Sequence, residues 1–541
     1  MNSVDVRKCA LAATVVAAAW LSGERDCQAA GVWRAVPNAP EVLAETALLL
    51  TDGTVMVHGF QSGDWWRLSP DGTGSYVNGT LSQVASLPAG YTPLYFASAV
   101  LPDGRVLVEG GEYNGSERET NRGAIFDPIA NAWTPVPHYI FWLAIGDAPS
   151  VVLANGTFML GHVSGSAQAL FDPITLSWTL TGAGKHDLNN EEGWTLLPSG
   201  KVLTVDVSTP GFTELYDPST GSWQGAGLTP QSLVNTADSE VGPSILMADG
   251  RVFAVGGLSN TALYSPAGGS WSAGPNLPVA AEGQLYGSDA PAALLPNGHV
   301  LFAAGPMKPG TGPAPLPWVA GVHFLEFDGV GLADVGRAGN AASNVTYAER
   351  FLLLPTGEVL VTDCTKSIQI FQPAGAPNPA WAPTISSVPS VLLSGSTRTI
   401  TGTQFNGLSQ AVAYGDDAQA ATNYPLVRIT HNATGHVRYA RTHGHSTMAV
   451  ATGSQIVSTS MDIPYETTYV GPTTVQVVAN GIASAGVASC ISMDATLACS
   501  ASCGGQVSDA CGGLVACPKK TGAACCFALG GTWVGGRCVF S

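Results

Sequence analysis

A short stretch near the end of the chain, Thr430 to Ser446, gathers side chains that bind metal ions or pair with carboxylates. It reads THNATGHVRYARTHGHS and holds four of the ten histidines. In an extended chain residues two apart share a face, so His443 and His445 could hold one metal ion together. Arg438 and Arg441 could instead pair with carboxylates through their forked donors. The candidate metal ligands of this stretch are His436, His443 and His445.

Acidic side chains recur seven to nine residues before a series of turns that end in glycine. Carboxylates gathered around one axis need counter-charge, because like charges raise each other's pKa and cost stability. A calcium ion, a mixed carboxylate–histidine site for manganese, iron or zinc, or the two arginines could supply it. The candidate channel residues are Glu45, Asp147, Glu191, Glu192, Glu240, Asp289, Glu349, Arg438 and Arg441.

These acids precede hairpins that repeat along the chain. Each of seven units is an apolar run, a turn and a second apolar run, as in FASAVLPDGRVLVEGG. The turns recur at intervals of 44 to 59 residues. Asp-Gly and Asn-Gly predict two-residue turns in which both residues tolerate positive φ. The turns are Asp52-Gly53, Asp103-Gly104, Asn155-Gly156, Ser199-Gly200, Asp249-Gly250, Asn297-Gly298 and Thr356-Gly357.

Four units continue with a short strand that ends on tryptophan, as in ELYDPSTGSW. We interpret these tryptophans as packing wedges between neighbouring units. A repeat of about 50 residues with four short strands is typical of one propeller blade, so the sequence predicts a seven-bladed β-propeller over residues 31–381. Gly31 to Trp33 are expected to supply the outer strand that closes the ring. The tryptophans are Trp133, Trp178, Trp223 and Trp271.

Two further domains are predicted after the repeats, so the chain as a whole is expected to be all-β. Residues 382–489 alternate apolar and polar side chains between turns, which indicates an immunoglobulin-like β-sandwich. Residues 490–541 hold eight of the 11 cysteines, which predicts a small disulfide-rich module of open connectivity. A zinc site is the alternative, although short C-x2-C knuckles are absent. The cysteines are Cys490, Cys499, Cys503, Cys511, Cys517, Cys525, Cys526 and Cys538.

The first 30 residues have the pattern of a secretory signal peptide. Arg7 and Lys8 precede a short apolar run from Cys9 to Leu21, and small residues follow at Ala29 and Ala30. The run is too short for a membrane span, and no second long apolar run follows. We therefore expect a secreted or cell-surface protein without a membrane span.

The hairpin followed by LYDPSTGSW resembles the kelch repeat, and the predicted architecture is similar to that of galactose oxidase and its bacterial relatives. The resemblance covers residues 31 to about 490 and implies a propeller followed by a β-domain. It also implies a copper site with two tyrosines and two histidines, one tyrosine being cross-linked to a cysteine.

The residues that would form this copper site are largely missing. Tyr347, in TYAERFLLLPTG, matches a family tyrosine, but Ala348 stands where a histidine is expected. The place of the family cysteine falls in PLYFASAVLPDG, which has Tyr95 but no cysteine. Cys364 follows its hairpin turn, and we interpret it as lying at the wrong end of the unit. Copper-radical chemistry is therefore disfavoured.

Two further positions complete the match. The place of the cross-linked tyrosine falls near Asp147, and the last family histidine matches His436 or His431. The resemblance thus implies Tyr347 and His436 as candidate catalytic residues.

Charge and site residues together favour binding over catalysis. A formal charge of -17 repels phosphate backbones, so a nucleic-acid partner is not expected. We expect a monomeric carbohydrate- or surface-binding protein whose acidic channel is capped by residues 430–446. The cofactor is unknown, with a divalent cation (calcium, copper or another transition metal) as the candidate. The alternatives are a galactose oxidase-like oxidoreductase with altered ligands and a metal-dependent hydrolase or lyase using Asp147, Glu191 and Asp289.

Overall fold

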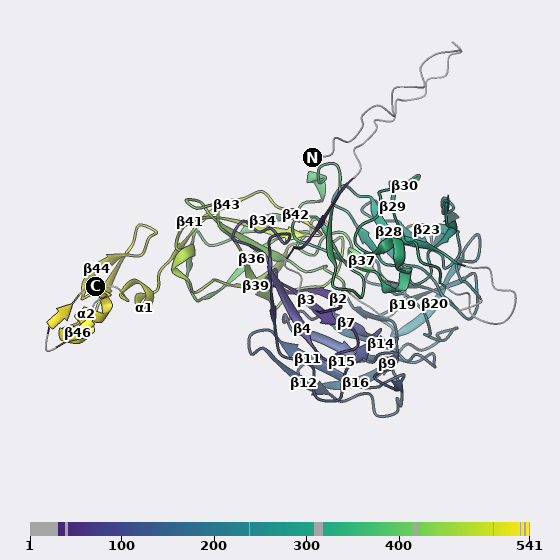
Figure 1. Cartoon of the computed structure of the whole chain (residues 1–541), viewed down its shortest axis with the longest axis horizontal. Coiled ribbons are helices and arrows are strands. Elements are labelled where there is room, and N and C mark those ends of the chain that lie inside the picture. The colour runs from purple at the N-terminus through teal and green to yellow at the C-terminus, as the bar shows by residue number, and fades with distance from the viewer. Residues whose placement is uncertain are drawn as a thin grey trace, which may run out of the picture.

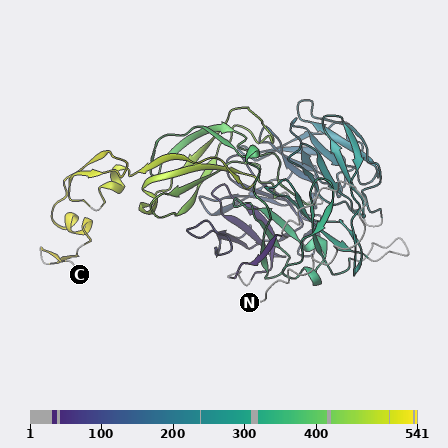
Figure 2. The ribbon, with the colours of Figure 1, turned by 90° about the horizontal axis from the view of Figure 1, so that it is seen from above.

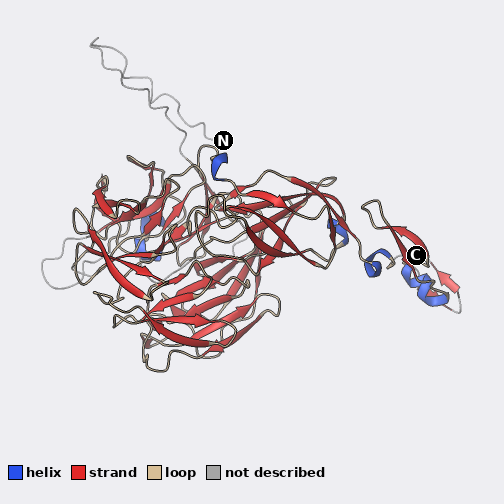
Figure 3. Ribbon diagram, turned by 180° about the vertical axis from the view of Figure 1, so that it is seen from behind, coloured by secondary structure: helices blue, strands red, loops and turns tan. Residues whose placement is uncertain are grey.

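The structure, a computed structural model, describes residues 31–37, 42–236, 239–307, 318–414, 420–500, 502–530, 532–534 and 537–539. The expected signal peptide, residues 1–30, lies outside these ranges. Strands dominate the described chain (Figure 3). No helix among the described residues is long and apolar enough to cross a bilayer.

Seven antiparallel meanders of four strands make up the body of the described chain, and we number them sheet 1 to sheet 7. The first strands are β2 (Ala44–Leu49), β7 (Ala97–Val100), β13 (Ser150–Val152), β17 (Thr195–Leu196), β21 (Ser244–Leu246), β27 (Ala292–Leu294) and β31 (Arg350–Leu353). The second strands are β3 (Val55–Gly59), β8 (Val106–Glu109), β14 (Phe158–Gly161), β18 (Val202–Val205), β22 (Val252–Val255), β28 (Val300–Pro306) and β32 (Val359–Thr362).

The outer strands complete each meander. The third strands are β4 (Trp65–Ser69), β11 (Gly123–Asp127), β15 (Gln168–Asp172), β19 (Phe212–Asp217), β23 (Thr261–Ser265), β29 (His323–Phe327) and β33 (Ile368–Gln372). The fourth strands are β5 (Thr80–Gln83), β12 (Ala132–Val136), β16 (Ser177–Thr181), β20 (Ser222–Leu228), β24 (Ser270–Ala273), β30 (Leu332–Asp334) and β1 (Val32–Ala35). Smaller elements are β6 (Pro93–Leu94), β9 (Tyr113–Asn114), β10 (Glu117–Arg118), β25 (Val279–Ala280), β26 (Gly283–Tyr286), η2 (Ala341–Ser343), η3 (Thr346–Ala348) and η4 (Pro379–Trp381).

The sheets follow one another around a closed path. First strands of successive sheets contact each other in sheets 1 to 3 and again in sheets 4 to 7, and β31 contacts β2. The N-terminal strand β1 pairs with β33 and completes sheet 7, with Trp33 opposite Phe371. The expected outer strand at Gly31 to Trp33 is therefore confirmed. The arrangement is propeller-like (Figure 1), with apolar first and second strands buried between neighbouring sheets.

The predicted hairpins form, but their turns are one residue longer than expected. In sheet 1, Leu50 N–H donates to Thr54 O over 2.7 Å and Gly53 N–H donates to Leu50 O over 2.9 Å. Gly53 has φ +77°, whereas Asp52 does not adopt positive φ. A three-residue loop with a left-handed third residue matches these bonds. Asp52 instead accepts a hydrogen bond from Thr54 N–H at 3.0 Å, which fixes the turn through its side chain.

The tryptophans tie each sheet to the preceding one, as predicted. Trp133 Nε1 donates to Ala85 O at 2.9 Å, and Trp178 Nε1 donates to Pro137 O at 2.7 Å. Trp223 Nε1 reaches Gln168 Oε1 at 2.9 Å. Each indole thus packs as a wedge and also satisfies its own N–H.

A nine-stranded sheet follows the propeller-like body and curves around its own core. Strand β34 contacts β41 although four strands separate them along the sheet, and a separate apolar cluster that includes Leu392, Val427 and Ile491 lies between the strands. The strands are β34 (Thr384–Ser387), β35 (Val391–Leu393), β36 (Thr397–Thr403), β38 (Leu426–His431), β39 (Val437–His443), β40 (Val457–Asp462), β41 (Gly471–Ala479), β42 (Ile482–Ala483) and β43 (Val487–Ser492), with η5 (Thr467–Tyr469).

One short strand of this region, β37 (Val412–Ala413), leaves the nine-stranded sheet and pairs with β27 of sheet 6. It also contacts β31 and β21, so it lies between the first strands of three sheets. Gln410 Oε1 accepts a hydrogen bond from Leu196 N–H of β17 at 2.8 Å. The centre of the propeller-like body is therefore filled by residues 410–414.

The C-terminal module projects from the far side of the nine-stranded sheet (Figures 1 and 2). Its elements are α1 (Ala495–Ala498), β44 (Gly505–Ser508), β45 (Leu514–Cys517), α2 (Gly522–Ala528), β46 (Thr532–Val534) and β47 (Arg537–Val539). All eight predicted cysteines form disulfides, which typify oxidising compartments. The pairs are Cys490–Cys511, Cys499–Cys517, Cys503–Cys525 and Cys526–Cys538.

Candidate functional site

Four aromatic side chains from neighbouring sheets meet near the start of β2, and we call them the aromatic mouth. Tyr95 directly precedes β7 and Tyr347 lies in η3 before β31, and their rings meet edge to face with centroids 6.3 Å apart. Trp318 lies 5.3 Å from Tyr347, and Tyr113 lies 6.4 Å from Tyr95. All four side chains are half-buried, so part of each ring remains accessible.

Strained backbone conformations occur just before several first strands. Tyr95 has φ +53°, Glu191 has φ +56° and Asp289 has φ +47°, each shortly before the first strand of its sheet. L-residues rarely adopt this left-handed conformation, and such strain concentrates at functional sites. The mouth therefore combines accessible rings with a backbone that costs free energy to hold.

A buried cation lies beneath the rings. The guanidinium carbon of Arg350 stands 3.9 Å from the ring centroid of Tyr414 and 5.5 Å from that of Tyr95. A terminal nitrogen of Arg350 is 3.8 Å from Glu45 Oε1. Arg350 is almost fully buried, so these cation–π contacts act where water is excluded.

Glu45 is balanced by a histidine as well as by the arginine. His58 Nδ1 lies 2.6 Å from Glu45 Oε2, and His58 Nε2 lies 2.8 Å from Ser62 O. Burial raises the pKa of Glu45, but the hydrogen bond and charge of His58 and the charge of Arg350 outweigh it and lower the pKa overall. Both ring nitrogens of His58 face oxygen acceptors when Glu45 is ionised. The carboxylate is thus a charged group inside the protein, in which Oε2 contacts His58 and Oε1 lies 3.8 Å from Arg350 without a hydrogen-bond partner.

Cys364 lies at the mouth, which corrects its expected place at the wrong end of its unit. Arg350 pairs with Thr362 across the β31–β32 hairpin, so residues just beyond Thr362 return to the level of η3. Cys364 Sγ donates to Ala348 O at 3.5 Å, and Cys364 N–H donates to Ala44 O. A residue after an antiparallel hairpin comes back beside the residues before it.

The residues at the mouth do not fit copper. Tyr95, Tyr347 and Cys364 gather there, but burial raises the pKa of both phenols and of the thiol, which disfavours their anionic forms. His58 already uses both ring nitrogens, and the Arg350 cation lies beside Tyr95. Within the described residues, the group of side chains with metal-ligand spacing lies elsewhere. Copper binds imidazole nitrogen strongly, and none is available here.

The predicted channel acids stand in or shortly before first strands, but they do not share one counter-charge. Glu45 pairs with Arg350 and His58, whereas Glu192 pairs with Lys185 in sheet 4. Burial, together with the charge of Asp363, raises the pKa of Glu349, and Asn344 Nδ2 donates to it at 3.3 Å. Of the remaining acids, Asp147 is buried, and Glu191, Glu240 and Asp289 are half-buried.

The stretch from Thr430 to Ser446 does not meet these acids. It forms the β38–β39 hairpin, and Thr442 N–H donates to Thr51 O while Gly444 N–H donates to Pro102 O. Both acceptors stand beside hairpin turns, at the end of each sheet opposite the mouth. Six residues of β2 separate the two ends, about 20 Å at the rise of an extended strand. The predicted cap over the acidic channel is therefore wrong.

The charged residues of this stretch have local partners. Arg438 lies 3.0 Å from Glu466, and Arg441 lies 3.1 Å from Asp462. His443 Nε2 is also 3.1 Å from Asp462.

The candidate histidines do not form a metal group within the described chain. His445 Nδ1 lies 2.9 Å from Thr459 Oγ1, and burial lowers the pKa of His445 to about 3. His436 is exposed, beside the tight turn between β38 and β39. His443 and His445 thus have separate hydrogen-bond partners, Asp462 and Thr459.

A second group of charged side chains, which we call the acidic cluster, is buried in sheet 4. Lys185 Nζ donates to Glu192 Oε1 at 2.9 Å and to Glu214 Oε2 at 2.6 Å. Asp187 and Asp206 offer carboxylate oxygens within 4.8 Å of one from Glu192. Four carboxylates therefore surround one ammonium group.

Burial dominates the ionisation of this cluster. It raises the pKa of Glu192 to about 8, against the opposing charge of Lys185. It raises the pKa of Asp206 to about 7, again against Lys185 and with added repulsion from Glu214. Like charges in a dry site explain both directions. The cluster is short of positive charge.

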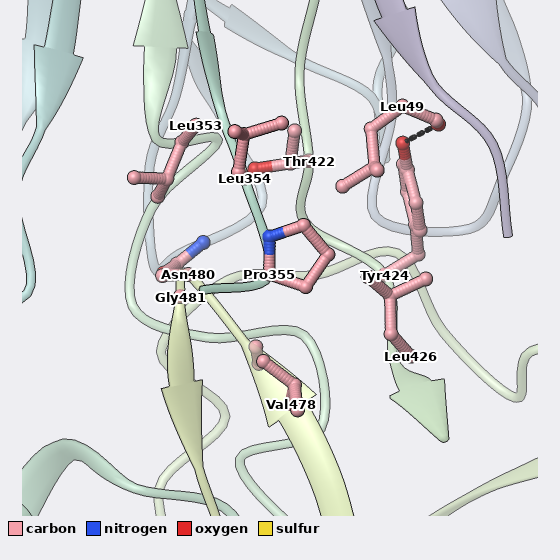
Figure 4. A pocket seen from close by; sticks show the side chains of 11 residues that line it. Leu49, Leu353, Leu354, Pro355, Thr422, Tyr424, Leu426, Val478, Asn480 and Gly481 are labelled. Atoms are coloured by element: carbon pink, nitrogen blue, oxygen red, sulfur yellow. Dashed lines mark hydrogen bonds between the residues drawn. The ribbon is translucent and has the colours of Figure 1, made fainter. Parts of the chain in front are cut away.

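Two packing hollows among the described residues lie away from both groups. One at the junction with the nine-stranded sheet has about 10 Å³ of free space, roughly one water molecule (Figure 4). There Tyr424 donates its hydroxyl to Leu49 O. Another, of about 400 Å³, lies among turns that include Thr73, Pro296 and Thr356 and has Glu358 as its one ionisable lining residue.

Comparison with known proteins finds distant similarity to solved structures only. No family model and no curated protein matches the sequence. A fungal alcohol oxidase of the AA5 family, in complex with copper, is 15% identical over 86% of this chain and 99% of that chain, with a TM-score of 0.47.

Two other solved structures show weaker similarity. A catalytically inactive variant of virginiamycin B lyase from Staphylococcus aureus, with quinupristin, is 9% identical over 63% of this chain and 99% of that chain, with a TM-score of 0.45. YCF48 bound to D1 peptide is 13% identical over 67% and 98%, with a TM-score of 0.42. Such identities concern architecture, so function must be argued from side chains.

Proposed function

We propose that the protein is an exported carbohydrate-binding protein whose ligand stacks on the aromatic mouth. The proposal takes the seven sheets as blades of a kelch-type propeller and the nine-stranded sheet as an immunoglobulin-like sandwich. The observation that carries it is the set of four half-buried rings held edge to face above a buried cation. The flat apolar face of a pyranose ring packs on such rings, and nearby polar groups orient its hydroxyls.

The surroundings of the mouth favour an uncharged sugar. Asp289 is half-buried close enough to Tyr347 for its charge to raise the pKa of that tyrosine. Glu349 adjoins η3, and the whole chain carries a formal charge of -17. A field of this sign repels sulfated or carboxylated glycans. Carboxylates and the hydroxyl of Tyr347 can accept hydrogen bonds from sugar hydroxyls.

Glycan-array screening, followed by calorimetry with the best neutral oligosaccharide, tests the proposal. Tyr347→Ala and Trp318→Ala should each weaken binding about tenfold, since one lost aromatic contact is worth up to about 1.4 kcal/mol. Tyr465→Ala is the matched control, because Tyr465 is exposed on the other domain. Retained binding in both mouth variants, or no glycan bound by the folded wild type, would contradict the proposal.

A galactose oxidase-like oxidoreductase with altered ligands is the second candidate. The observation that favours it is that Cys364, Tyr95 and Tyr347 gather at one mouth. Elemental analysis for copper and measurement of peroxide release from primary alcohols test it. A peptide joining Cys364 to a tyrosine, two hydrogen atoms lighter than its parts, would support it. Protein without copper, peroxide release or cross-link would exclude it.

Export and a monomeric state belong to the same proposal. The leader pattern of residues 1–30 and the four disulfides of the C-terminal module support passage into an oxidising compartment. Light scattering on the secreted protein would measure its mass. A mass of two chains or more would contradict the monomer.

A further inference from the structure

We propose that the acidic cluster of sheet 4 binds one hard divalent cation through Asp187, Glu192 and Asp206. One carboxylate oxygen from each lies within 4.8 Å of the other two. Oxygens bound to one calcium ion at 2.3–2.6 Å stand at up to about 5 Å from each other. Asp187 and Glu192 lie in the loop before β17, and Asp206 directly follows β18.

The charge of the cluster leaves room for a cation. Glu214 is fully engaged, since Oε2 accepts from Lys185 and Oε1 accepts from His186 N–H at 2.8 Å. Lys185 is thus shared between Glu214 and Glu192, and Asp187 and Asp206 have no ammonium of their own. Buried carboxylates that lack a counter-charge are costly, and a bound cation removes that cost.

Asp206 gives a second and separate indication. Its side chain is 0% exposed, yet Oδ1 has no hydrogen-bond partner. Its other oxygen meets only His186 Nδ1, at 3.3 Å. Buried polar atoms are almost always satisfied by protein, water or ions. One oxygen of this carboxylate lies within 4.8 Å of an oxygen from each of Asp187 and Glu192, so a cation bound between them would satisfy the buried group.

The other two ligands are held in place by bonds that leave lone pairs for a metal. Asp187 Oδ2 accepts from Ser208 N–H at 2.7 Å, and Asp187 Oδ1 accepts from Leu188 N–H at 2.8 Å. Glu192 Oε2 accepts from the hydroxyl of Thr204 at 3.2 Å. Such outer contacts fix the orientation of carboxylate ligands.

The ligand set favours a hard ion. All three donors are carboxylate oxygens, which suit calcium, magnesium and manganese. His186 stands at the edge of the cluster with its side chain 55% exposed, so this side is open to solvent. Its Nδ1, beside Asp206, would add a nitrogen ligand for manganese.

Terbium luminescence tests the inference on the full chain after treatment with a chelator. Lys185 Nζ lies 5.0 Å from the ring of Trp223, so an ion bound in the cluster lies near an indole that can transfer energy to it. We expect terbium emission that saturates at one ion per chain and is displaced by calcium or manganese. Absence of saturable emission and of any rise in Tm with calcium or manganese would overturn the proposal.

Variants assign the signal to the cluster. Asp206→Asn should weaken terbium binding at least tenfold, whereas Asp363→Asn, at the corresponding repeat position in sheet 7, should not. Glu192→Gln provides a second test, with the buried Glu109→Gln as its control. Unchanged binding in folded Asp206→Asn and Glu192→Gln, checked by circular dichroism, would contradict the site. Neither result depends on sugar binding, so this inference can fail without the proposed function.

Discussion

The aromatic mouth and the acidic cluster both lie around the starts of first strands, but their buried charges are balanced differently. At the mouth, Glu45 meets both Arg350 and His58, and aromatic rings cover the cation. In sheet 4, Lys185 pairs with Glu192 and Glu214, while the described residues give Asp187 and Asp206 no ammonium or guanidinium partner. The first site already holds a buried cation, and the second is the one that we propose to bind a metal ion.

This difference shows how one scaffold position serves two chemistries. The backbone places a side chain at the start of each first strand, and the local sum of charges decides what that position binds. A site whose buried charges are balanced presents the faces of its aromatic rings, whereas a site with too little positive charge favours binding of a cation. Removing a charged side chain from either site should therefore change the free energy of unfolding by a measurable amount.

Removal of the lysine should have the largest effect. Lys185→Met leaves four buried carboxylates without their ammonium group, and loss of one partner of a buried ion pair costs about 3–5 kcal/mol of unfolding free energy. Urea unfolding in chelator measures the loss, and calcium should restore part of it. Lys201→Met, which breaks a half-exposed pair with Asp217, is the control and should cost no more than about 1 kcal/mol. Equal losses in the two variants would contradict the charge deficit.

Removal of the arginine should cost less, because His58 still pairs with Oε2 of Glu45. We expect Arg350→Met to lower the free energy of unfolding by about 1–3 kcal/mol, the cost of a buried group that loses a partner. Arg350→Lys keeps the charge but loses the planar stacking over Tyr414, so it should recover only part of the loss. Full recovery by lysine would show that the aromatic contact contributes nothing.

The two sites should also differ in acid. The folded-state pKa of Glu45 is lowered, so its stabilisation is present above the unfolded pKa of about 4.3 and is lost as pH falls through the folded value. Glu45→Gln should therefore be less stable than wild type at pH 7, and the gap should narrow below pH 4. Urea unfolding across this range measures it. A gap that does not change with pH would contradict an ionised Glu45.

The smallest effect is expected on the hairpin that first suggested a metal site. Arg438→Ala breaks a half-exposed pair with Glu466 and should cost about 0–1 kcal/mol. It should leave both sugar binding and terbium binding unchanged. A loss of either ligand in this variant would return residues 430–446 to the functional site.

Much of the fold could be predicted from the sequence because glycine turns and tryptophans recur with fixed spacing. Gly53 is predicted to form a turn and Trp133 to pack between neighbouring units, and both do so in the structure. The turn length was wrong because Asp-Gly suits both two- and three-residue loops. The tail could be predicted from cysteine density alone, and its pairing could not.

The sites were harder, because they depend on contacts between units. Arg350 looks like the edge of an apolar strand, and its partners come from β2, β7 and the central segment. Asp206 and Asp363 each stand six residues after a turn glycine, where sheets 1, 2 and 5 have glycine. An acid at a position where other units have glycine is a usable signal of a site. It lies after the turn, whereas the predicted acids lie before it. The density of histidines predicted a metal site, but the β38–β39 hairpin gives His443 and His445 hydrogen-bond partners of their own.

Calorimetry of a neutral oligosaccharide with metal-free protein is the most direct test of sugar binding at the aromatic mouth. We predict that the wild-type protein binds the sugar after chelation. A Tyr95→Ala, Tyr347→Ala double variant should retain its fold and bind about a hundredfold more weakly, because it loses two aromatic contacts. Sugar turnover that appears only when copper is restored, with release of peroxide, would contradict it.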